Sequence, residues 1–382
     1  MVKFLLKVVI FSLPIALFFA FPVSIFLLGR ENVSLKEVVT QQVTKPETIY
    51  GNAYSNEGLF YYKSLLTQTK QAKVVVIGTS RSLGFRQEFF KEPHFFVNAG
   101  MAGRYVKDVE YFVNSLSTST DMVLFIVLDQ DLLFQDPAKI SSLHEGGTAF
   151  FGENIHLPLA SSRGVYLDYF VRKKFSLETL LKSREEYPHI GVTALIDGNG
   201  FRSDGSYRYA KERNDVGRRV RVAAQIKASI RQTDGDAKQV SETERQYVLS
   251  NLETLKEVLL TAREKSITVV GIIPPLPTPI RDSLVGQKNS YTTAFTATID
   301  NTPDTHLKEL FKKNSTALFD ISDITLYKGV DQEFIDPVHA TDLLYAKALL
   351  YISSQDRGLS VLFDITRLKN MITKREGDFL RE

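Results

Sequence analysis

Five short runs of apolar residues recur along the chain, each with the length of a buried β-strand. They lie at about 73–77, 94–98, 121–128, 267–273 and 316–321. Between and around them, apolar residues recur with helical spacing at about 58–70, 84–91, 104–117, 242–265 and 340–353. Strands that alternate with helices predict right-handed βαβ units, so we expect an α/β fold. The predicted architecture is a three-layer sandwich with a flavodoxin-like parallel sheet.

The N-terminal segment is apolar over a longer stretch than any of these strands. Val8 to Leu28 is 21 residues without a charge, with Lys3 and Lys7 before it and Arg30 after it. At 1.5 Å per residue this is about 31 Å of helix, enough to cross a bilayer core. No convincing small-residue cleavage pattern follows, so an uncleaved anchor is favoured over a cleaved signal peptide. The lysines favour a cytoplasmic N-terminus. We therefore expect a single-pass protein of the bacterial inner (cytoplasmic) membrane, with its C-terminal domain in the periplasm or extracytoplasmic space.

These patterns divide the chain into four parts. Residues 1–30 form the membrane anchor, and residues 31–70 form a polar connector. Residues 71–355 form the α/β domain, which carries an insertion at 130–240, and residues 356–382 form a C-terminal helical tail.

Two short motifs about 250 residues apart supply a serine, a histidine and a carboxylate. Gly78-Thr79-Ser80-Arg81 follows the first apolar run, and Asp336-Pro337-Val338-His339 opens the last helical stretch. An imidazole can take the hydroxyl proton of a serine while a carboxylate orients the imidazole, which makes a weak alcohol nucleophilic. A serine after an all-Val/Ile strand lies at the carboxyl edge of a parallel sheet, where open α/β sheets bind ligands. Ser80 and Asp336 could instead act only as helix caps.

A third segment completes the pattern of a known family. The apolar run at 94–98 ends in Asn98-Ala99-Gly100-Met101-Ala102-Gly103. With this loop, Ser80 and the late Asp336-x-x-His339, the chain resembles the SGNH (GDSL-like) hydrolase superfamily, in a membrane-anchored bacterial envelope branch. The resemblance implies that Ser80 is the nucleophile, His339 the base, Asp336 the orienting carboxylate and the Gly103 amide an oxyanion donor. The order and strand context of these motifs extend from about residue 73 to residue 352.

The chain departs from the family pattern in two places. The family's third block places an asparagine after strand 3, but here the strand at 121–128 runs into Asp129-Gln130-Asp131. Gln130 falls near that asparagine, so we expect its amide to donate to the oxyanion instead. In the first block, Thr79 replaces the family's aspartate and Arg81 follows the serine.

Composition narrows the classes of partner and the kinds of chemistry that the chain can support. The 47 basic and 44 acidic residues give a net charge of +3, which is no global footprint of nucleic-acid binding. The chain has no cysteine, so disulfides and thiolate chemistry are excluded. The scattered histidines lack ligand spacing, so we expect no metal, and the serine chemistry that the resemblance implies needs no organic cofactor. The basic stretch from Arg208 to Arg221 fits either an anionic glycan or lipid headgroup, or a solvated helix face.

The sequence therefore favours a membrane-anchored serine esterase or O-acyltransferase that acts on acyl esters of a cell-envelope glycan or lipid-linked saccharide. A non-catalytic envelope assembly or glycan-binding protein on the same fold is the alternative. A third possibility is an anchored scaffold whose insertion recruits a polysaccharide-synthesis complex.

Overall fold

The computed structural model describes residues 1–54, 58–118, 121–141, 159–186, 188–235, 241–286 and 306–381. The chain forms two compact units. Unit 1 consists of Met1–Tyr61, Glu145–Ser203 and Tyr207–Lys211. Unit 2 consists of Tyr62–His144, Asp204–Ser206 and Glu212–Glu382. The segment 130–240 thus contributes to both units.

Unit 2 is built on a parallel sheet of five strands. They are β1 Val74–Gly78, β2 Phe96–Gly100, β3 Val123–Val127, β6 Thr268–Ile273 and β7 Ala317–Asp320. Their order is β2-β1-β3-β6-β7, and every neighbouring pair is parallel. Each apolar run of the sequence forms one of these strands, which confirms the prediction of an α/β fold with a parallel sheet.

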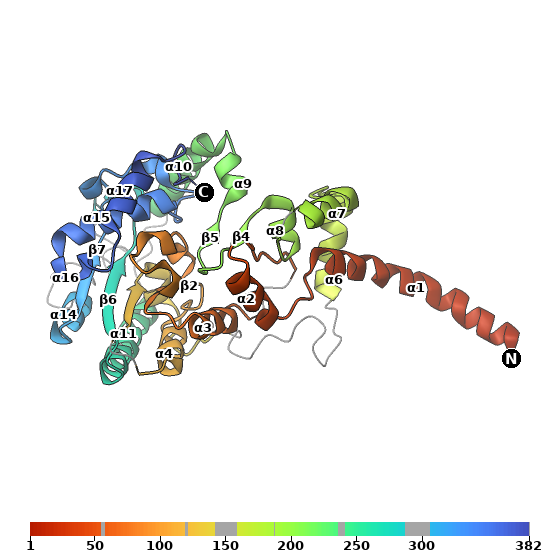
Figure 1. Cartoon of the computed structure of the whole chain (residues 1–382), viewed down its shortest axis with the longest axis horizontal. Helices are drawn as coiled ribbons and strands as arrows, with labels where there is room; N and C mark the ends of the chain where they lie inside the picture. The colour runs from red at the N-terminus through yellow and green to blue at the C-terminus, as the bar shows by residue number, and fades with distance from the viewer. Residues whose placement is uncertain are drawn as a thin grey trace. The chain divides into compact units, whose positions relative to one another are not determined.

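Helices lie on both sides of this sheet (Figure 1). Figure 1 shows α4 and α11 together on one side, and α15 and α17 on the other. The described helices of unit 2 are α4 Val106–Ser115, α5 Gln130–Phe134, α10 Arg218–Gly235, α11 Glu242–Glu264, α12 Thr278–Gly286, α14 His306–Lys313, α15 Asp342–Gln355, α16 Arg357–Ser360 and α17 Ile365–Thr373. Helices α3 Leu59–Thr69 and α9 Ala210–Asn214 each include residues of both units.

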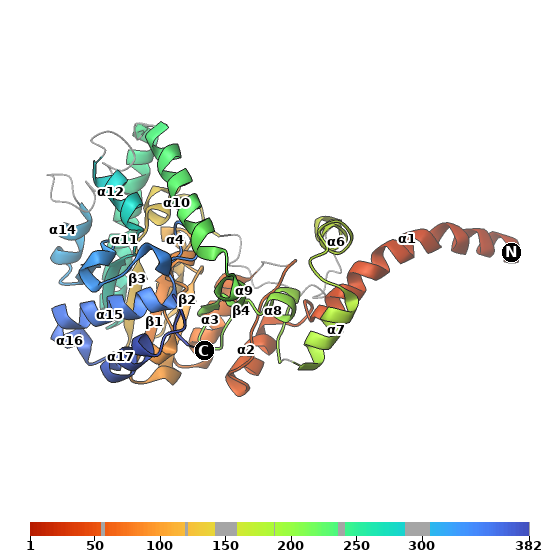
Figure 2. The ribbon, with the colours of Figure 1, turned by 90° about the horizontal axis from the view of Figure 1, so that it is seen from above.

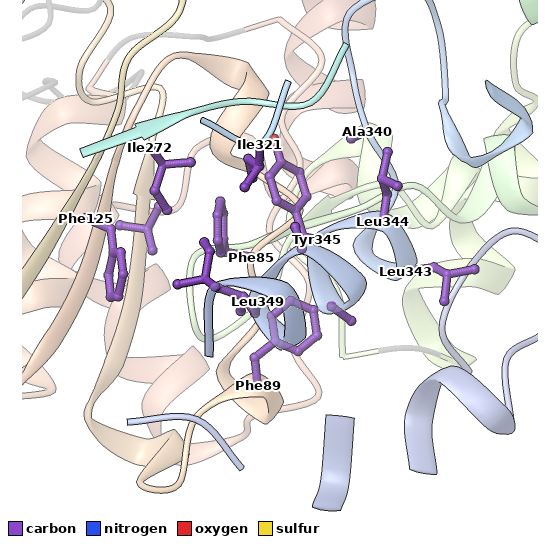
Figure 3. Packing of buried hydrophobic residues seen from close by; sticks show 14 of the residues in the cluster. Phe85, Phe89, Phe125, Ile272, Ile321, Ala340, Leu343, Leu344, Tyr345 and Leu349 are labelled. Atoms are coloured by element: carbon purple, nitrogen blue, oxygen red, sulfur yellow. The ribbon is translucent and has the colours of Figure 1, made fainter. Parts of the chain in front are cut away.

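The main core of unit 2 lies between the sheet and α15. Alternate side chains of a strand point to one face, and on this face Phe125 and Ile272 are buried. They belong to one cluster with Leu344 and Leu349 of α15, as Figure 3 shows. Phe89 enters the same cluster from the segment that follows β1. This packing holds α15, and with it the turn that precedes it, against the sheet.

The prediction of a helix at 84–91 is wrong. This segment forms short 3₁₀ turns, η1 Ser80–Ser82 and η2 Gln87–Phe89. The side-chain amide of Asn98 donates to the carbonyl oxygens of Ser82 and Phe85, at 2.8 and 2.9 Å. Those carbonyls are then bound by a side chain of β2, so tertiary contacts override the apolar spacing that indicated a helix.

The C-terminal residues pack into unit 2. Phe363 and Leu380 are fully buried in the α15 cluster. The buried Arg218 guanidinium binds the Asp378 carboxylate and also donates to the carbonyl oxygen of Phe334. One arginine therefore joins α10, the chain end and the segment that leads to Asp336.

Unit 1 is a mostly helical module with one small antiparallel pairing. Its helices are α1 Val2–Gly29, α2 Leu35–Thr44, α6 Leu159–Tyr166, the π-helical turn η5 Leu167–Val171, α7 Leu177–Glu186 and α8 Val192–Asp197 (Figure 2). Strands β4 Gly200–Phe201 and β5 Tyr207–Arg208 pair with each other, and Tyr50 bridges to Ile190 and Phe201. The end of α1 therefore shares a module with residues more than a hundred positions later.

Within the described part of the chain, α1 is the one helix long and apolar enough to cross a membrane. Its described apolar side chains are exposed from Val2 to Phe18. Ile25 and Phe26, near its end, are instead fully buried in a core with Val165 and Leu180. The last turns of α1 thus belong to the folded part of unit 1.

Glu31, two residues after α1, is a buried acid that holds unit 1 together. One carboxylate oxygen accepts the amides of Ala53 and Val192, each at 2.8 Å, and the other accepts the amide of Tyr54 at 3.4 Å. Burial raises the pKa of Glu31 from 4.5 to about 7, although the three amides act in the opposite direction. The carboxyl group therefore binds a proton more tightly in the folded chain than in the unfolded chain.

The free energy of unfolding should accordingly fall as the pH rises from about 4.5 to about 7. In that window the folded state keeps a proton that the unfolded state has lost, which corresponds to about 3 kcal/mol in all. Glu31→Gln retains an acceptor oxygen for the amides but cannot titrate. Urea unfolding of the full chain in detergent, at pH 5 and pH 7, should show a larger pH-dependent loss for the wild type than for this variant. Equal losses would contradict the assignment.

Candidate active site

Ser80 lies where the direction of the sheet's strand order reverses. It follows β1, which has β2 on one side and β3 on the other. The connection after β1 leads to β2, whereas the connection after β3 leads the opposite way across the sheet, to β6. Open α/β sheets bind ligands in the crevice outside the carboxyl ends of their strands at such a point. The serine is half-buried and begins the 3₁₀ turn η1.

Three elements hold the Ser80 turn. The Thr79 hydroxyl donates to the carboxylate of the buried Asp129, which follows β3 and caps α5. The Arg81 guanidinium donates to the carbonyl oxygen of Pro275, after β6, at 2.6 Å. The hydroxyl of the buried Tyr345 on α15 donates to the carbonyl oxygen of Arg81. Thr79 and Arg81, on either side of Ser80, therefore both hold the turn that carries the serine.

Asn98 supports the same turn from β2. Its side-chain oxygen accepts a hydrogen bond from the amide of Gly100 at 2.8 Å, and its side-chain amide donates to the carbonyl oxygens of Ser82 and Phe85. A Cβ at Gly100 would lie 2.5 Å from the Ser82 hydroxyl and 2.7 Å from the Asn98 side-chain oxygen, so the loop needs glycine there. The Asn98 side chain is fully engaged and acts as a positioning group.

A buried lysine that the sequence did not single out lies behind Asn98. The Lys63 ammonium group donates to the Asn98 carbonyl oxygen at 3.0 Å and to the Gly205 carbonyl oxygen. Burial lowers the pKa of Lys63 to about 7, although the charge of Asp204 acts to raise it. No periodicity or motif marks such a residue, because its partners are backbone carbonyls from distant segments.

Asp336 and His339 lie in a tight turn directly before α15. Phe334 pairs with Ala340 across the turn, and the Ile335 amide donates to the His339 carbonyl oxygen at 2.8 Å. One oxygen of Asp336 accepts the amides of Val338 and His339, both at 2.9 Å. The motif thus forms its own turn, and the helix that it was expected to open begins at Asp342.

The structure brings Ser80, His339 and Asp336 together. His339 Nδ1 lies 2.7 Å from the second carboxylate oxygen of Asp336, and His339 Nε2 lies 2.8 Å from the Ser80 hydroxyl oxygen. Since a carboxylate can only accept, Nδ1 carries the proton and Nε2 is the acceptor that faces the hydroxyl. Both distances fall within hydrogen-bond range for a serine, its base and the orienting acid.

The Asp336 carboxylate stays charged in this turn. Burial alone would raise its pKa, but the hydrogen bond from His339, the positive charge of His339 when it is protonated, and the amides of Val338 and His339 outweigh burial and lower the pKa from its ordinary value of 3.8. The carboxylate is therefore ionised at neutral pH, as an acid that must stabilise an imidazolium should be.

The groups expected to donate to an oxyanion differ in the hydrogen bonds that the structure gives them. The Gly103 amide donates to the Gly78 carbonyl oxygen at 3.3 Å, and the Met101 amide donates to the same oxygen at 2.8 Å. In this arrangement the Gly103 amide is engaged by the backbone and does not face a substrate. The Ser80 amide has no acceptor among the described residues, so it is the donor that the site offers. The side chain of Gln130, at the start of α5, lies outside the described residues.

The basic stretch after Arg208 is tied into ion pairs. Besides the Arg218 pair, Arg219 binds Asp378 at 2.8 Å and Lys211 binds Asp197 at 3.2 Å. These contacts favour a structural role for the stretch over a glycan-binding one. Within the described ranges, no three His, Asp or Glu side chains are grouped so that they could hold a metal ion.

Comparison with models of known protein families gives no match to this chain. Comparison with curated protein sequences gives no significant match either. The geometry of Ser80, His339 and Asp336 is therefore the basis for assigning a function.

Proposed function

We propose that this chain is a membrane-anchored serine hydrolase of the SGNH type, an esterase or O-acyltransferase that acts on acyl esters of a cell-envelope glycan. The observation that carries the proposal is the continuous hydrogen-bonded line from Asp336 through His339 to Ser80. Its position at the carboxyl edge of a sheet with order β2-β1-β3-β6-β7, which doubly wound flavodoxin-like folds share, supports the same reading.

The chemistry follows from the positions of the three groups. The Ser80 hydroxyl oxygen attacks the acyl carbonyl carbon while His339 Nε2 takes the hydroxyl proton. The C–O bond to the leaving alcohol then breaks, and His339 gives that alcohol the proton. An acyl-Ser80 ester remains until a second hydroxyl, of water or of a sugar, attacks its carbonyl carbon while giving its proton to His339. The bond between the acyl group and the Ser80 oxygen then breaks, and His339 returns the proton to that oxygen. Water completes an esterase reaction, and a sugar completes an acyl transfer.

The membrane assignment supports the substrate class. If α1 crosses the inner membrane with Lys3 and Lys7 on the cytoplasmic side, the rest of the chain lies in the periplasm or extracytoplasmic space. An anchored enzyme there meets envelope polymers and lipid-linked saccharides at the membrane surface. An open sheet edge suits an extended substrate of this kind.

A non-catalytic role is the second candidate, favoured by the engaged Gly103 amide. Loss of one oxyanion donor typically lowers turnover by about 10²–10³-fold. An assembly or glycan-binding protein would keep the fold and the polar site without needing that donor.

The test is an acyl-transfer assay with the purified full chain in detergent. An aryl acetate is supplied alone or with a neutral oligosaccharide, and free acetate and acetylated sugar are measured by mass spectrometry. Acetate formation indicates an esterase, and acetylated sugar indicates a transferase. If neither product exceeds the level of a Ser80→Ala control with any acyl ester, the enzymatic proposal fails and the binding role replaces it.

A further inference from the structure

The exposed part of α1 is shorter than the apolar run in the sequence. The described side chains of α1 are exposed from Val2 to Ala20, except that of Phe19, which is half-buried, whereas Ile25 and Phe26 are enclosed by unit 1. Lys3 and Lys7 lie on the cytoplasmic side in this arrangement, so the uncharged exposed stretch runs from Val8 to Ala20, 13 residues or about 20 Å of helix. The stretch available to lipid therefore ends near Ala20, about two turns before the end of the helix.

Aromatic rings of residues 166–170 pack against α1 at that level. The Phe18 ring stacks on Tyr166 with centroids 4.9 Å apart, and the Phe21 ring contacts Tyr169 at 5.0 Å and Phe170 at 5.5 Å. The Tyr166 hydroxyl donates to the Phe18 carbonyl oxygen. Tyrosine is enriched where proteins cross the membrane–water boundary, because its ring is apolar and its hydroxyl polar.

The tip of this cluster is apolar and exposed. In the π-helical turn η5, Phe170 is 59% exposed and Val171 is 70% exposed. Arg172, Lys173 and Lys174 follow directly and are exposed as well. Apolar side chains beside a short run of cations are typical of segments that lie in the interface of an anionic membrane.

We propose that residues 166–174 form a second membrane contact, in which Phe170 and Val171 enter the headgroup region of the bilayer that α1 crosses. The occupant is lipid because the exposed tip is continuous with the lipid-facing length of α1 through Phe21. Arg172 and Lys174 are held by Asp168, at 2.9 and 3.1 Å, so the cations are fixed beside the tip. Unit 1 thus rests on the membrane surface. This inference depends on the membrane anchoring proposed above.

The chain contains no tryptophan, so a single introduced tryptophan reports its own surroundings. Four full-length variants serve as probes: Phe170→Trp and Val171→Trp at the proposed contact, Phe11→Trp in the exposed middle of α1, and Val216→Trp at a fully exposed position of unit 2. Each is reconstituted into nanodiscs of phosphatidylcholine and phosphatidylglycerol, with and without brominated acyl chains. Tryptophan emission is then recorded.

We expect brominated lipid to quench Phe11→Trp strongly and Val216→Trp not at all. Phe170→Trp should lose roughly half of its emission and shift to shorter wavelength, as expected for a depth of about 5–10 Å. Val171→Trp should behave in the same way and guards against a local perturbation at position 170.

The two assumptions fail in distinguishable ways. If Phe11→Trp is quenched while both Phe170→Trp and Val171→Trp emit as in water, the anchor stands and the second contact is overturned. If Phe11→Trp is also unquenched, α1 does not enter the bilayer, and the anchor and the contact both fail.

Discussion

Ser80→Ala and His339→Ala should each lower hydrolysis of a short-chain aryl ester by roughly 10⁴–10⁶-fold. Each removes one of two groups that must act in the same step, because the hydroxyl 2.8 Å from Nε2 is activated only while the imidazole can accept its proton. Combining the two substitutions should cost little more than either alone, since members of such a unit do not contribute additively. Steady-state rates of the purified full chain in detergent measure all three.

Two further variants separate the chemistry from the fold. Asp336→Asn should retain more activity than the alanine variants, because orientation is weakened while the base survives. Ser115→Ala serves as the control: among the described residues, the Ser115 hydroxyl on α4 donates to the Phe112 carbonyl oxygen at 2.7 Å, far from Ser80 in the chain, so turnover should be unchanged. Retention of wild-type activity by Ser80→Ala would remove the serine from the mechanism.

Arg218→Met should lower the free energy of unfolding by about 3–5 kcal/mol. The substitution removes one partner of a buried ion pair and leaves Asp378, whose side chain is 9% exposed, with less compensation. The Phe334 carbonyl oxygen loses its donor too, next to the turn that holds Asp336 and His339. Ester hydrolysis should therefore fall in this variant even under conditions in which the protein stays folded.

Arg219→Met is a matched control for this prediction. Arg219 binds the same carboxylate of Asp378, at 2.8 Å, but its own side chain is 58% exposed. Exposed ion pairs contribute about 0–1 kcal/mol, so this variant should unfold near the wild-type urea midpoint. Similar midpoints for the Arg218 and Arg219 variants would show that burial does not set the strength of the pair.

The parallel sheet and the triad could be predicted because their signals are local. Each strand is a continuous apolar run, and Ser80 directly follows one of them, so topology alone brings it to a known edge. The juxtaposition of Ser80 with His339, expected from motif order, is present at hydrogen-bond distance. The bond between Thr79 and Asp129 could not be predicted, because it joins side chains from two strand ends with no shared motif.

The organisation of the N-terminal part could not be read from hydropathy either. An apolar run looks the same whether lipid or protein covers it, so the run to Leu28 gave no sign that Ile25 and Phe26 are buried in unit 1. The pairing of Tyr50 with Ile190 and Phe201 is equally non-local. Such contacts depend on packing between distant segments, which periodicity does not encode.

The most direct test of the central claim is covalent labelling of the full-length chain with a fluorophosphonate probe. The probe reacts with a serine only when a neighbouring base activates it, and intact mass followed by peptide mapping locates the adduct. Our account predicts one adduct per chain on Ser80, which is absent in Ser80→Ala and strongly reduced in His339→Ala. A folded wild-type chain that takes up no probe, or takes it up at another serine, would contradict the assignment of Ser80 as an activated nucleophile.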